Sequence, residues 1–264
     1  MKKYFVIGNP ITHSLSPELH TFWFNINKIE AIYKKQELSS KEIKNFILQI
    51  REKKINGANI TVPFKKEIIP HLDILSDEAK ITQSVNTICF NDDKLIGHNT
   101  DIVGFEFAIK EKKYTVHNKN VFILGAGGVV PSIVFSLNKM KVSEIIISNR
   151  TKQKAENLKK IFKNLNIVDW GDVPTFDVVI NATSLGLNKE FINIDFSNVG
   201  NNKLFYDVIY NPSETNFLKE AKKLGNLTEN GKLMFIYQAY EAFKIWHGIE
   251  PVIDSEIIKL LDND

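Results

Sequence analysis

The chain has a single cysteine, Cys89, so no disulfide can form within it. Cys89 lies in the apolar run from Val85 to Phe90, where a buried strand thiol fits better than a nucleophile. The six histidines lack the short spacings of a metal site, so we expect no bound metal. These shortages exclude a disulfide-rich scaffold and give no sign of a metalloprotein.

An excess of one charge is also missing. The 34 basic and 31 acidic residues leave a formal net charge of +3, spread along the whole chain, so we expect no nucleic-acid partner. No apolar run approaches the roughly 18 residues of a membrane helix. The N-terminal apolar stretch turns to Gly8-Asn9-Pro10 before it reaches the length of a signal-peptide core. We therefore expect a soluble cytoplasmic protein that does not enter membranes.

Hydrophobic residues make up 43% of the chain, enough for one large core or two smaller ones. In the first hundred residues, strand-like runs alternate with stretches of helical spacing, which predicts βαβαβ order and a parallel sheet. The expected strands are Tyr4–Gly8, Ala31–Leu38 and Gly57–Val62, with helices from Ser16 onward and over Ser40–Lys54. Two more strands are expected over Val85–Asn91 and Leu95–His98, around a hairpin turn.

Near Asn99-Thr100-Asp101 the pattern restarts, and a second domain begins with the buried-looking strand Val121–Leu124. Strands and helices alternate again after it, which is typical of a doubly wound α/β domain. The expected strands are Glu144–Ser148, Asp177–Asn181 and Leu204–Val208, and the expected helices are Lys152–Phe162, Glu214–Leu224, Gly231–Trp246 and Asp254–Leu261. We find no internal repeat and no low-complexity linker.

A glycine-rich turn follows the first strand of this second domain. Gly125-Ala126-Gly127-Gly128-Val129 connects that strand to a helix, where a pyrophosphate could approach the backbone N–H groups of the helix N-terminus. The usual third glycine position holds Val130, so the fingerprint is imperfect. A tight turn without a ligand is the alternative.

A basic turn ends the next strand of the second domain. NAD-binding folds place an acidic residue there, whereas this chain has Asn149-Arg150-Thr151 and then Lys154, with no carboxylate before Glu156. A guanidinium can bind a 2′-phosphate through two parallel hydrogen bonds. The turn favours NADP(H) over NAD, and a solvated basic turn is the alternative.

Short motifs in a fixed order resemble the shikimate dehydrogenase family across essentially the whole chain. The motifs are Ser14-Leu15-Ser16-Pro17, Asn59 to Lys65, Val85-Asn86-Thr87, Asn99-Thr100-Asp101, Gly125 to Gly128, Asn149-Arg150-Thr151, Asn181 to Gly186 and Tyr210-Asn211-Pro212. No single motif is specific, but the ordered set is. Alone, Ser16-Pro17 reads as an ordinary helix cap, Thr100 or Asp101 could likewise cap the helix that follows, and Lys65 could be a surface lysine.

The resemblance implies a fold and a set of roles. It implies an N-terminal open α/β substrate domain over residues 1–100, a doubly wound Rossmann NADP-binding domain over 101–235, and C-terminal helices over 236–264 that return to the substrate domain. Lys65 and Asp101 would be the catalytic pair. The substrate would be bound by Ser14, Ser16, Asn59, Thr61, Asn86, Tyr210 and Gln238. Besides the glycine-rich and basic turns, NADP(H) would be contacted by Asp77, Thr183, Val208 and Gly231.

The implied reaction is NADPH-dependent reduction of 3-dehydroshikimate, a small-molecule substrate, to shikimate by a monomer or homodimer. As hydride reaches the ketone carbon, its oxygen gains negative charge, which a nearby ammonium can stabilise and protonate. One alternative is a quinate/shikimate dehydrogenase with broader substrate or cofactor use. Another is a catalytically silent NADP-binding module, which would be expected to lack Lys65 or Asp101, and both are present.

Overall fold

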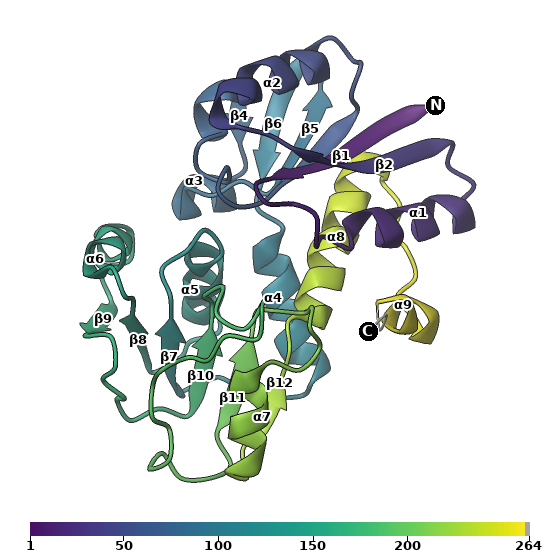
Figure 1. Cartoon of the computed structure of the whole chain (residues 1–264). Helices are drawn as coiled ribbons and strands as arrows, with labels where there is room; N and C mark the ends of the chain where they lie inside the picture. Colours follow the sequence, from purple (N-terminus) through teal and green to yellow (C-terminus); the bar gives the residue numbers. More distant parts are fainter. Residues whose placement is uncertain (262–264) are drawn as a thin grey trace. The chain divides into compact units, whose positions relative to one another are not determined.

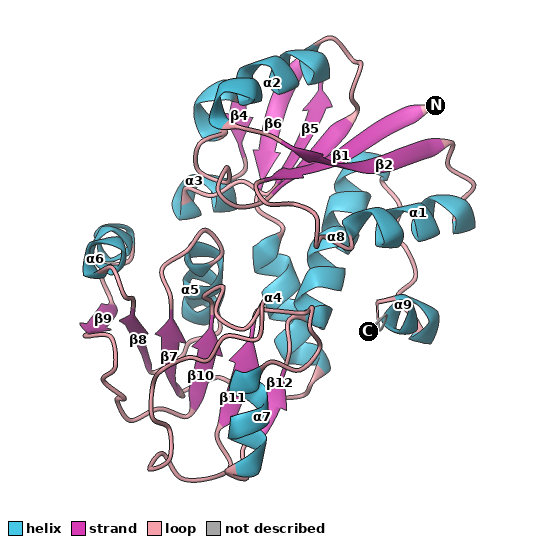
Figure 2. Ribbon diagram, viewed as in Figure 1, coloured by secondary structure: helices cyan, strands magenta, loops and turns pink. Residues whose placement is uncertain are grey.

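The computed structural model describes residues 1–261 and divides into two compact units. Of the described residues, unit 1 contains 1–104 and 236–261, and unit 2 contains 105–235. Figure 1 labels the helices and strands, and Figure 2 shows one strand-rich layer in each unit. Within residues 1–261, no helix is long and apolar enough to cross a membrane.

Unit 1 is a six-stranded sheet with helices on both faces. Its strands are β1 (Lys2–Gly8), β2 (Ala31–Glu37), β3 (Gly57–Ile60), β4 (Ile74–Leu75), β5 (Thr87–Asn91) and β6 (Lys94–His98). Its helices are α1 (Ser16–Ile26), α2 (Ile43–Arg51), α3 (Asp77–Thr82) and α9 (Ser255–Leu260), with short 3₁₀ turns at Ser40–Glu42 and Ile69–His71. Helices α4 (Asp101–Glu111) and α8 (Lys232–His247) have residues in both units.

The two faces of the unit 1 sheet are covered by different helices. Phe46 and Ile50 of α2 pack in one cluster with Ile7 and Ile60 of the sheet. On the other face, α1 and the later part of α8 form an aromatic layer with the sheet residues Tyr4 and Tyr33. Alternating side chains of each strand therefore supply two separate apolar surfaces.

Unit 2 is a fully parallel sheet in the order β12-β11-β10-β7-β8-β9. Its strands are β7 (Asn120–Leu124), β8 (Glu144–Ser148), β9 (Leu165–Val168), β10 (Val178–Asn181), β11 (Leu204–Asp207) and β12 (Leu227–Glu229). Its helices are α5 (Val130–Lys139), α6 (Lys152–Ile161) and α7 (Asn216–Lys223), in addition to its parts of α4 and α8. This is the strand order of a Rossmann fold, in which the direction of winding reverses between β7 and β10.

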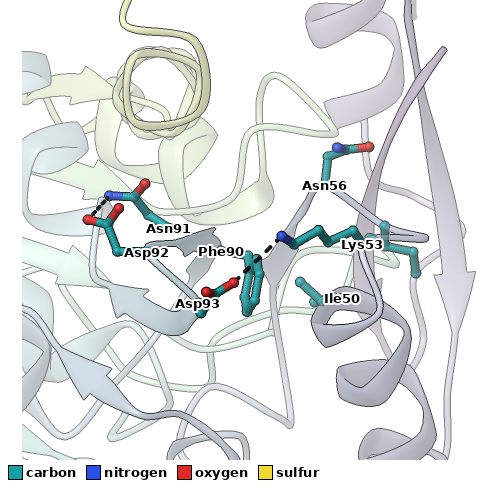
Figure 3. A pocket seen from close by; sticks show the side chains of 8 residues that line it. Ile50, Lys53, Asn56, Phe90, Asn91, Asp92 and Asp93 are labelled. Atoms are coloured by element: carbon teal, nitrogen blue, oxygen red, sulfur yellow. Dashed lines mark hydrogen bonds and ion pairs between the residues drawn. The ribbon is translucent and has the colours of Figure 1, made fainter.

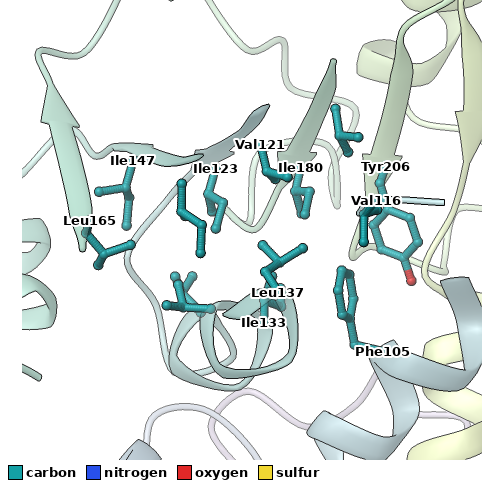
Figure 4. Packing of buried hydrophobic residues seen from close by; sticks show 14 of the residues in the cluster. Phe105, Val116, Val121, Ile123, Ile133, Leu137, Ile147, Leu165, Ile180 and Tyr206 are labelled. Carbon is teal, nitrogen blue, oxygen red and sulfur yellow. The ribbon is translucent and has the colours of Figure 1, made fainter. Parts of the chain in front are cut away.

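The largest core of unit 2 lies between this sheet and the helices on one face. Ile123 of β7 and Ile180 of β10 pack against Ile133 and Leu137 of α5, and Phe105 of α4 joins the same cluster (Figure 4). Val130, at the usual third glycine position, is fully buried in this core. Its side chain therefore serves packing, and Pro131 sits in the first turn of α5, where a missing N–H is tolerated.

The structure differs from the sequence interpretation in three features. The parallel pairing of β2, β1 and β3 and the β5–β6 hairpin are confirmed, but the place of the hairpin was not predicted: β5 pairs antiparallel with β3, so the sheet of unit 1 is mixed. The short strands β4, β9 and β12 were not predicted, since none of them contains three consecutive apolar residues. Ser16 is the first residue of α1 and not its cap; Leu15 occupies the cap position and makes no side-chain cap hydrogen bond.

Candidate active site

The expected site residues of unit 1 gather at one edge of its sheet. Strands β1 and β3 run parallel, and β6 runs the same way as β3 because both are antiparallel to β5. The carboxyl ends of β1, β3 and β6 therefore meet the start of β5. The residues at or beside these ends are Ser14, Ser16, Asn59, Thr61, Lys65, Asn86 and Asp101.

A buried ion pair forms the centre of this edge. The Nζ of Lys65 donates to the Oδ2 of Asp101 at 2.5 Å, and the two side chains are only 11% and 8% exposed. The neighbouring Lys66 is exposed, so Lys65 is not one of the chain's many surface lysines. An ammonium held in a water-poor setting can give a proton to a substrate oxygen.

The carboxylate of Asp101 is held on its other oxygen as well. The Nδ2 of Asn86 donates to Asp101 Oδ1 at 2.9 Å, while Asn86 Oδ1 accepts from the backbone N–H of Thr100 at 2.7 Å. Asn86, Thr100 and Asp101 are all buried. The pair is therefore fixed by a hydrogen-bonded frame rather than by charge alone.

Two serines lie at the start of α1, at the loop that follows β1. The Oγ of Ser14 lies 3.1 Å from the Oγ of Ser16 and also accepts from the Ser16 backbone N–H at 3.3 Å. Neither serine occupies the cap position of α1, and both hydroxyl groups can donate to a carboxylate at the positive end of the helix.

The glycine-rich turn of unit 2 has the backbone geometry that close approach requires. Gly125 has φ +106°, and a Cβ there would lie 2.8 Å from the carbonyl oxygen of Ala182. The turn leads through Gly127 and Val129 into α5, which follows β7 at the point where the winding of the sheet reverses. Doubly wound folds bind dinucleotides at this point.

The basic turn after β8 is tied to the glycine-rich turn. The Oδ1 of Asn149 accepts from the backbone N–H of Ala126 at 3.0 Å, and its Nδ2 donates to the carbonyl of Thr151 at 2.7 Å. Arg150 is exposed and makes no hydrogen bond or ion pair with any of the residues 1–261. Lys154 is also exposed. The nearby carboxylate of Asp169 is paired with Lys152 at 2.6 Å, and the turn itself has no acidic residue. A guanidinium beside the end of β8 fits a 2′-phosphate.

The buried carboxylate of Asp207, which sequence reasoning missed, connects the segments that follow β10 and β11. These segments contain the expected cofactor contacts Thr183 and Val208. Asp207, at the end of β11, accepts from Asn181 Nδ2 at 3.0 Å and from the Ile209 backbone N–H at 3.0 Å. Asn181 Oδ1 in turn accepts from the hydroxyl of Thr183 at 2.7 Å. Burial raises the pKa of Asp207 to about 6, although these hydrogen bonds and one from Thr215 oppose the rise. The signal in the sequence that could have identified Asp207 was a carboxylate at the end of an apolar strand.

The segment from Val208 to Gly231 has one position that admits only glycine. A Cβ on Gly231 would lie 2.0 Å from the carbonyl oxygen of Val208, so these two expected cofactor residues touch through their backbones. Tyr210 stacks on Phe235 with ring centres 4.3 Å apart. The structure thus brings together Val208, Gly231 and Tyr210 within unit 2.

The other two expected site residues lie on helices of unit 1. Gln238 is half-buried on α8, in unit 1. Asp77 begins α3, where its side chain is 89% exposed and pairs with Lys80 at 3.3 Å. Asp77 thus has the setting of an ordinary helix start, and no other expected site residue pairs with it.

A pocket of about 360 Å³ in unit 1 lies away from the Lys65–Asp101 pair (Figure 3). It is lined by the hairpin at the far end of β5 and by α2; Lys53 pairs with Asp93 at 3.6 Å and lies 5.6 Å from the centre of the Phe90 ring. Asn86 precedes β5 at its other end, roughly 13 Å along the strand. This pocket is therefore separate from the candidate site.

Among residues 1–261, no three or more His, Cys, Asp or Glu side chains are grouped so that they could hold a metal ion.

Comparisons with known proteins agree with this arrangement. One family model, described as the shikimate dehydrogenase substrate binding domain, matches residues 6–88, and another, described as shikimate / quinate 5-dehydrogenase, matches residues 107–194. A curated protein of Pelagibacter ubique (strain HTCC1062), named shikimate dehydrogenase (NADP(+)), is 57% identical over 264 residues, covering 99% of this chain and 100% of that protein.

Solved structures extend the likeness to the fold. A shikimate dehydrogenase in complex with NADP⁺ is 36% identical with a TM-score of 0.90, covering 100% of this chain and 94% of its own. The shikimate 5-dehydrogenase of Thermus thermophilus, in complex with NADP(H) and shikimate, is 30% identical with a TM-score of 0.90, covering 99% of this chain and 98% of its own. The chain therefore belongs to the shikimate dehydrogenase family.

Proposed function

We propose that this chain catalyses the reversible NADPH-dependent reduction of 3-dehydroshikimate to shikimate, with Lys65 as the proton donor and Asp101 as its partner. The observation that carries the proposal is the buried Lys65–Asp101 pair at the sheet edge, framed by Asn86. NADPH, when bound, supplies the hydride. As the ketone oxygen gains negative charge, an N–H of Lys65 stabilises it and passes a proton to it.

The side chains around the pair suit a carboxylated polyol. The hydroxyls of Ser14 and Ser16 can donate to the substrate carboxylate, and Asn86 and Thr61 can serve its hydroxyls because amides and hydroxyls both donate and accept. Asn59 supports Asn86 by donating from its Nδ2 to the Asn86 backbone carbonyl at 3.2 Å. Tyr210 and Gln238 complete the proposed set.

The cofactor would be held by unit 2. The turn Gly125 to Val129 leaves room for the pyrophosphate, and Asn149, Arg150, Thr151 and Lys154 line the end of β8, where the 2′-phosphate of NADP(H) would lie. Thr183, Val208 and Gly231 are proposed to face the nicotinamide half, and Asp77 is retained as a further contact. We propose residues 1–100 as the substrate domain, 101–235 as the NADP-binding domain and 236–264 as C-terminal helices that pack on the substrate domain, with 262–264 outside the described residues.

The direct test is oxidation of NADPH by the purified protein with 3-dehydroshikimate, run beside quinate plus NAD. We expect turnover with the first combination and a kcat/KM at least tenfold lower with the second. Comparable rates would identify a quinate/shikimate dehydrogenase, and NADPH binding without turnover would identify a silent binding module. We further propose a cytoplasmic enzyme that acts as a monomer or homodimer, which light scattering distinguishes.

Replacement of Arg150 by alanine should weaken the use of NADPH much more than that of NADH, because only NADPH loses a phosphate partner. Charge-assisted hydrogen bonds contribute about 1.5–3 kcal/mol, so the ratio of kcat/KM for the two cofactors should fall roughly tenfold to a hundredfold. Lys163→Ala removes the same charge from another exposed site of unit 2 and serves as the control. An unchanged ratio in folded Arg150→Ala would remove Arg150 from the site.

A further inference from the structure

A tyrosine on the second strand of the sheet extends the hydrogen-bonded frame of the Lys65–Asp101 pair. Tyr33 of β2 is 5% exposed, and its hydroxyl lies 2.6 Å from the Oδ1 of Asn59. Its ring stacks on His20, with ring centres 4.4 Å apart and planes 3° from parallel. The hydroxyl is thus held in place by both packing and hydrogen bonding.

The ring that stacks on Tyr33 is uncharged. Burial, with a smaller contribution from His247, lowers the pKa of His20 to about 3. Both ring nitrogens of His20 are buried without a hydrogen-bond partner among the described residues. No charge on this ring therefore competes with Asn59 for the Tyr33 hydroxyl.

The direction of each hydrogen bond follows from the Lys65 end of the frame. The ammonium of Lys65 can only donate and the carboxylate of Asp101 can only accept, so Asn86 must present its Nδ2 to Asp101. Asn86 Oδ1 then faces the Thr100 N–H, which can only donate. The amide orientation of Asn86 is thereby determined.

The same reasoning continues from Asn86 to Tyr33. The backbone carbonyl of Asn86 can only accept, so Asn59 presents its Nδ2 to it, at 3.2 Å, and to the Thr87 hydroxyl oxygen, at 2.9 Å. The Thr87 hydroxyl in turn donates to Asn86 Oδ1 at 3.2 Å, and its other neighbour is the Thr100 hydroxyl at 3.3 Å. Asn59 Oδ1 must then face Tyr33, whose hydroxyl donates to it. Donors therefore point in one direction from Tyr33 through Asn59, Thr87 and Asn86 to Asp101.

We propose that Tyr33 is a positioning residue for the reaction: its hydroxyl holds the amide of Asn59 in place and, through Thr87 and Asn86, the placement of Asp101 and Lys65. The proposal rests on the catalytic role proposed for Lys65 and Asp101. Without the Tyr33 hydroxyl, the buried Oδ1 of Asn59 loses its donor, and the amide is held only through its Nδ2, by the Asn86 carbonyl and the Thr87 hydroxyl. The Asn59 amide can then shift to find another donor, and the shift passes through its Nδ2 to Thr87 and Asn86.

Tyr33→Phe keeps the ring and its stacking on His20 and removes only the hydroxyl. We expect kcat with 3-dehydroshikimate and NADPH to fall on the order of tenfold, with KM changed less than about twofold. The loss is partial because Thr100 still holds Asn86. Tyr4→Phe is the matched control: Tyr4 is equally buried in the same aromatic layer but lies outside the hydrogen-bonded frame, and its kcat should stay at the wild-type value.

A second comparison separates positioning from general damage. If Tyr33 acts through Asn59, Tyr33→Phe should cause no further loss of kcat in an Asn59→Ala background. Multiplicative losses of kcat in the double variant would overturn the proposed route through Asn59. A kcat for Tyr33→Phe equal to that of Tyr4→Phe would overturn the positioning role itself.

A third measurement does not depend on activity. In protein labelled with ¹⁵N-asparagine, the side-chain NH₂ signals of Asn59 and Asn86 are identified by their loss in Asn59→Ala and Asn86→Ala. Both should shift in Tyr33→Phe and neither in Tyr4→Phe. Unmoved signals would overturn the proposal even if kcat fell, and moved signals with wild-type kcat would overturn it as well. Wild-type protein inactive with 3-dehydroshikimate would instead contradict the proposed function, while the two amide signals would still test the frame.

Discussion

Lys65→Ala is expected to lower kcat for 3-dehydroshikimate reduction by about 10²–10⁴, the usual contribution of a positioned acid or base. Substrate binding should change much less, because Ser14, Ser16 and Asn86 remain in place. The measurement is steady-state NADPH oxidation, with kcat and KM determined separately.

Lys66→Ala is the matched control for this prediction. It removes a lysine from the adjacent, exposed position and should leave kcat unchanged. If Lys65→Ala kept near-normal kcat, Lys65 would have a structural role only, and its burial against Asp101 would need another explanation.

Asp101→Asn is expected to destabilise unit 1 by about 3–5 kcal/mol, because it leaves the buried ammonium of Lys65 without a counter-charge. Removing the charge as well, in Lys65→Met/Asp101→Asn, should restore most of that loss, since no charge then remains buried. The loss of stability caused by Asp101→Asn should therefore depend on the charge of Lys65 and not on the amide that replaces the carboxylate.

Tryptophan fluorescence can report on unit 1 by itself. Trp23 and Trp246 lie in unit 1 and Trp170 in unit 2, so urea unfolding in a Trp170→Phe background follows unit 1. Asp93→Asn is the control: Asp93 also pairs with a lysine, but its side chain is 89% exposed, and the free energy of unfolding should not change. If Asp101→Asn still lowered the free energy of unfolding by the same amount in the Lys65→Met background, that result would contradict the charge argument.

The sequence predicted the parts of the fold that have a strong hydrophobic period. The long strands, the helices around them and the doubly wound order of unit 2 are confirmed. The antiparallel placement of β5 beside β3 was missed because βαβ order predicts the direction only of strands joined by a crossover helix. The segment between β3 and β5 contains only short elements, among them β4 and α3. That placement is what brings Asn86 to the edge where Lys65 lies.

The site residues that belong to short sequence motifs could be predicted. The residues that reach the site only through packing between distant parts of the chain could not. Lys65 and Asp101 were singled out from their motifs, but nothing local in the sequence shows that Lys65 is buried and Lys66 is not. Tyr33 and Asp207 were missed, since each contacts residues far along the chain: Tyr33 reaches Asn59, and Asp207 reaches Asn181. Such partners follow from strand pairing, which a single sequence does not reveal.

The most direct test of the central claim is the kcat of the Lys65→Ala/Asp101→Ala double variant beside both single variants, with 3-dehydroshikimate and NADPH. Asp101→Ala alone should reduce kcat and also raise KM, because we expect its carboxylate to accept a hydrogen bond from a substrate hydroxyl as well as to hold Lys65. If the two side chains act as one unit, the double variant should have a kcat within a few fold of the worse single variant, as residues that work together are strongly non-additive. A kcat reduced by the full product of the two single losses would contradict the account, because it would mean that Lys65 and Asp101 act independently.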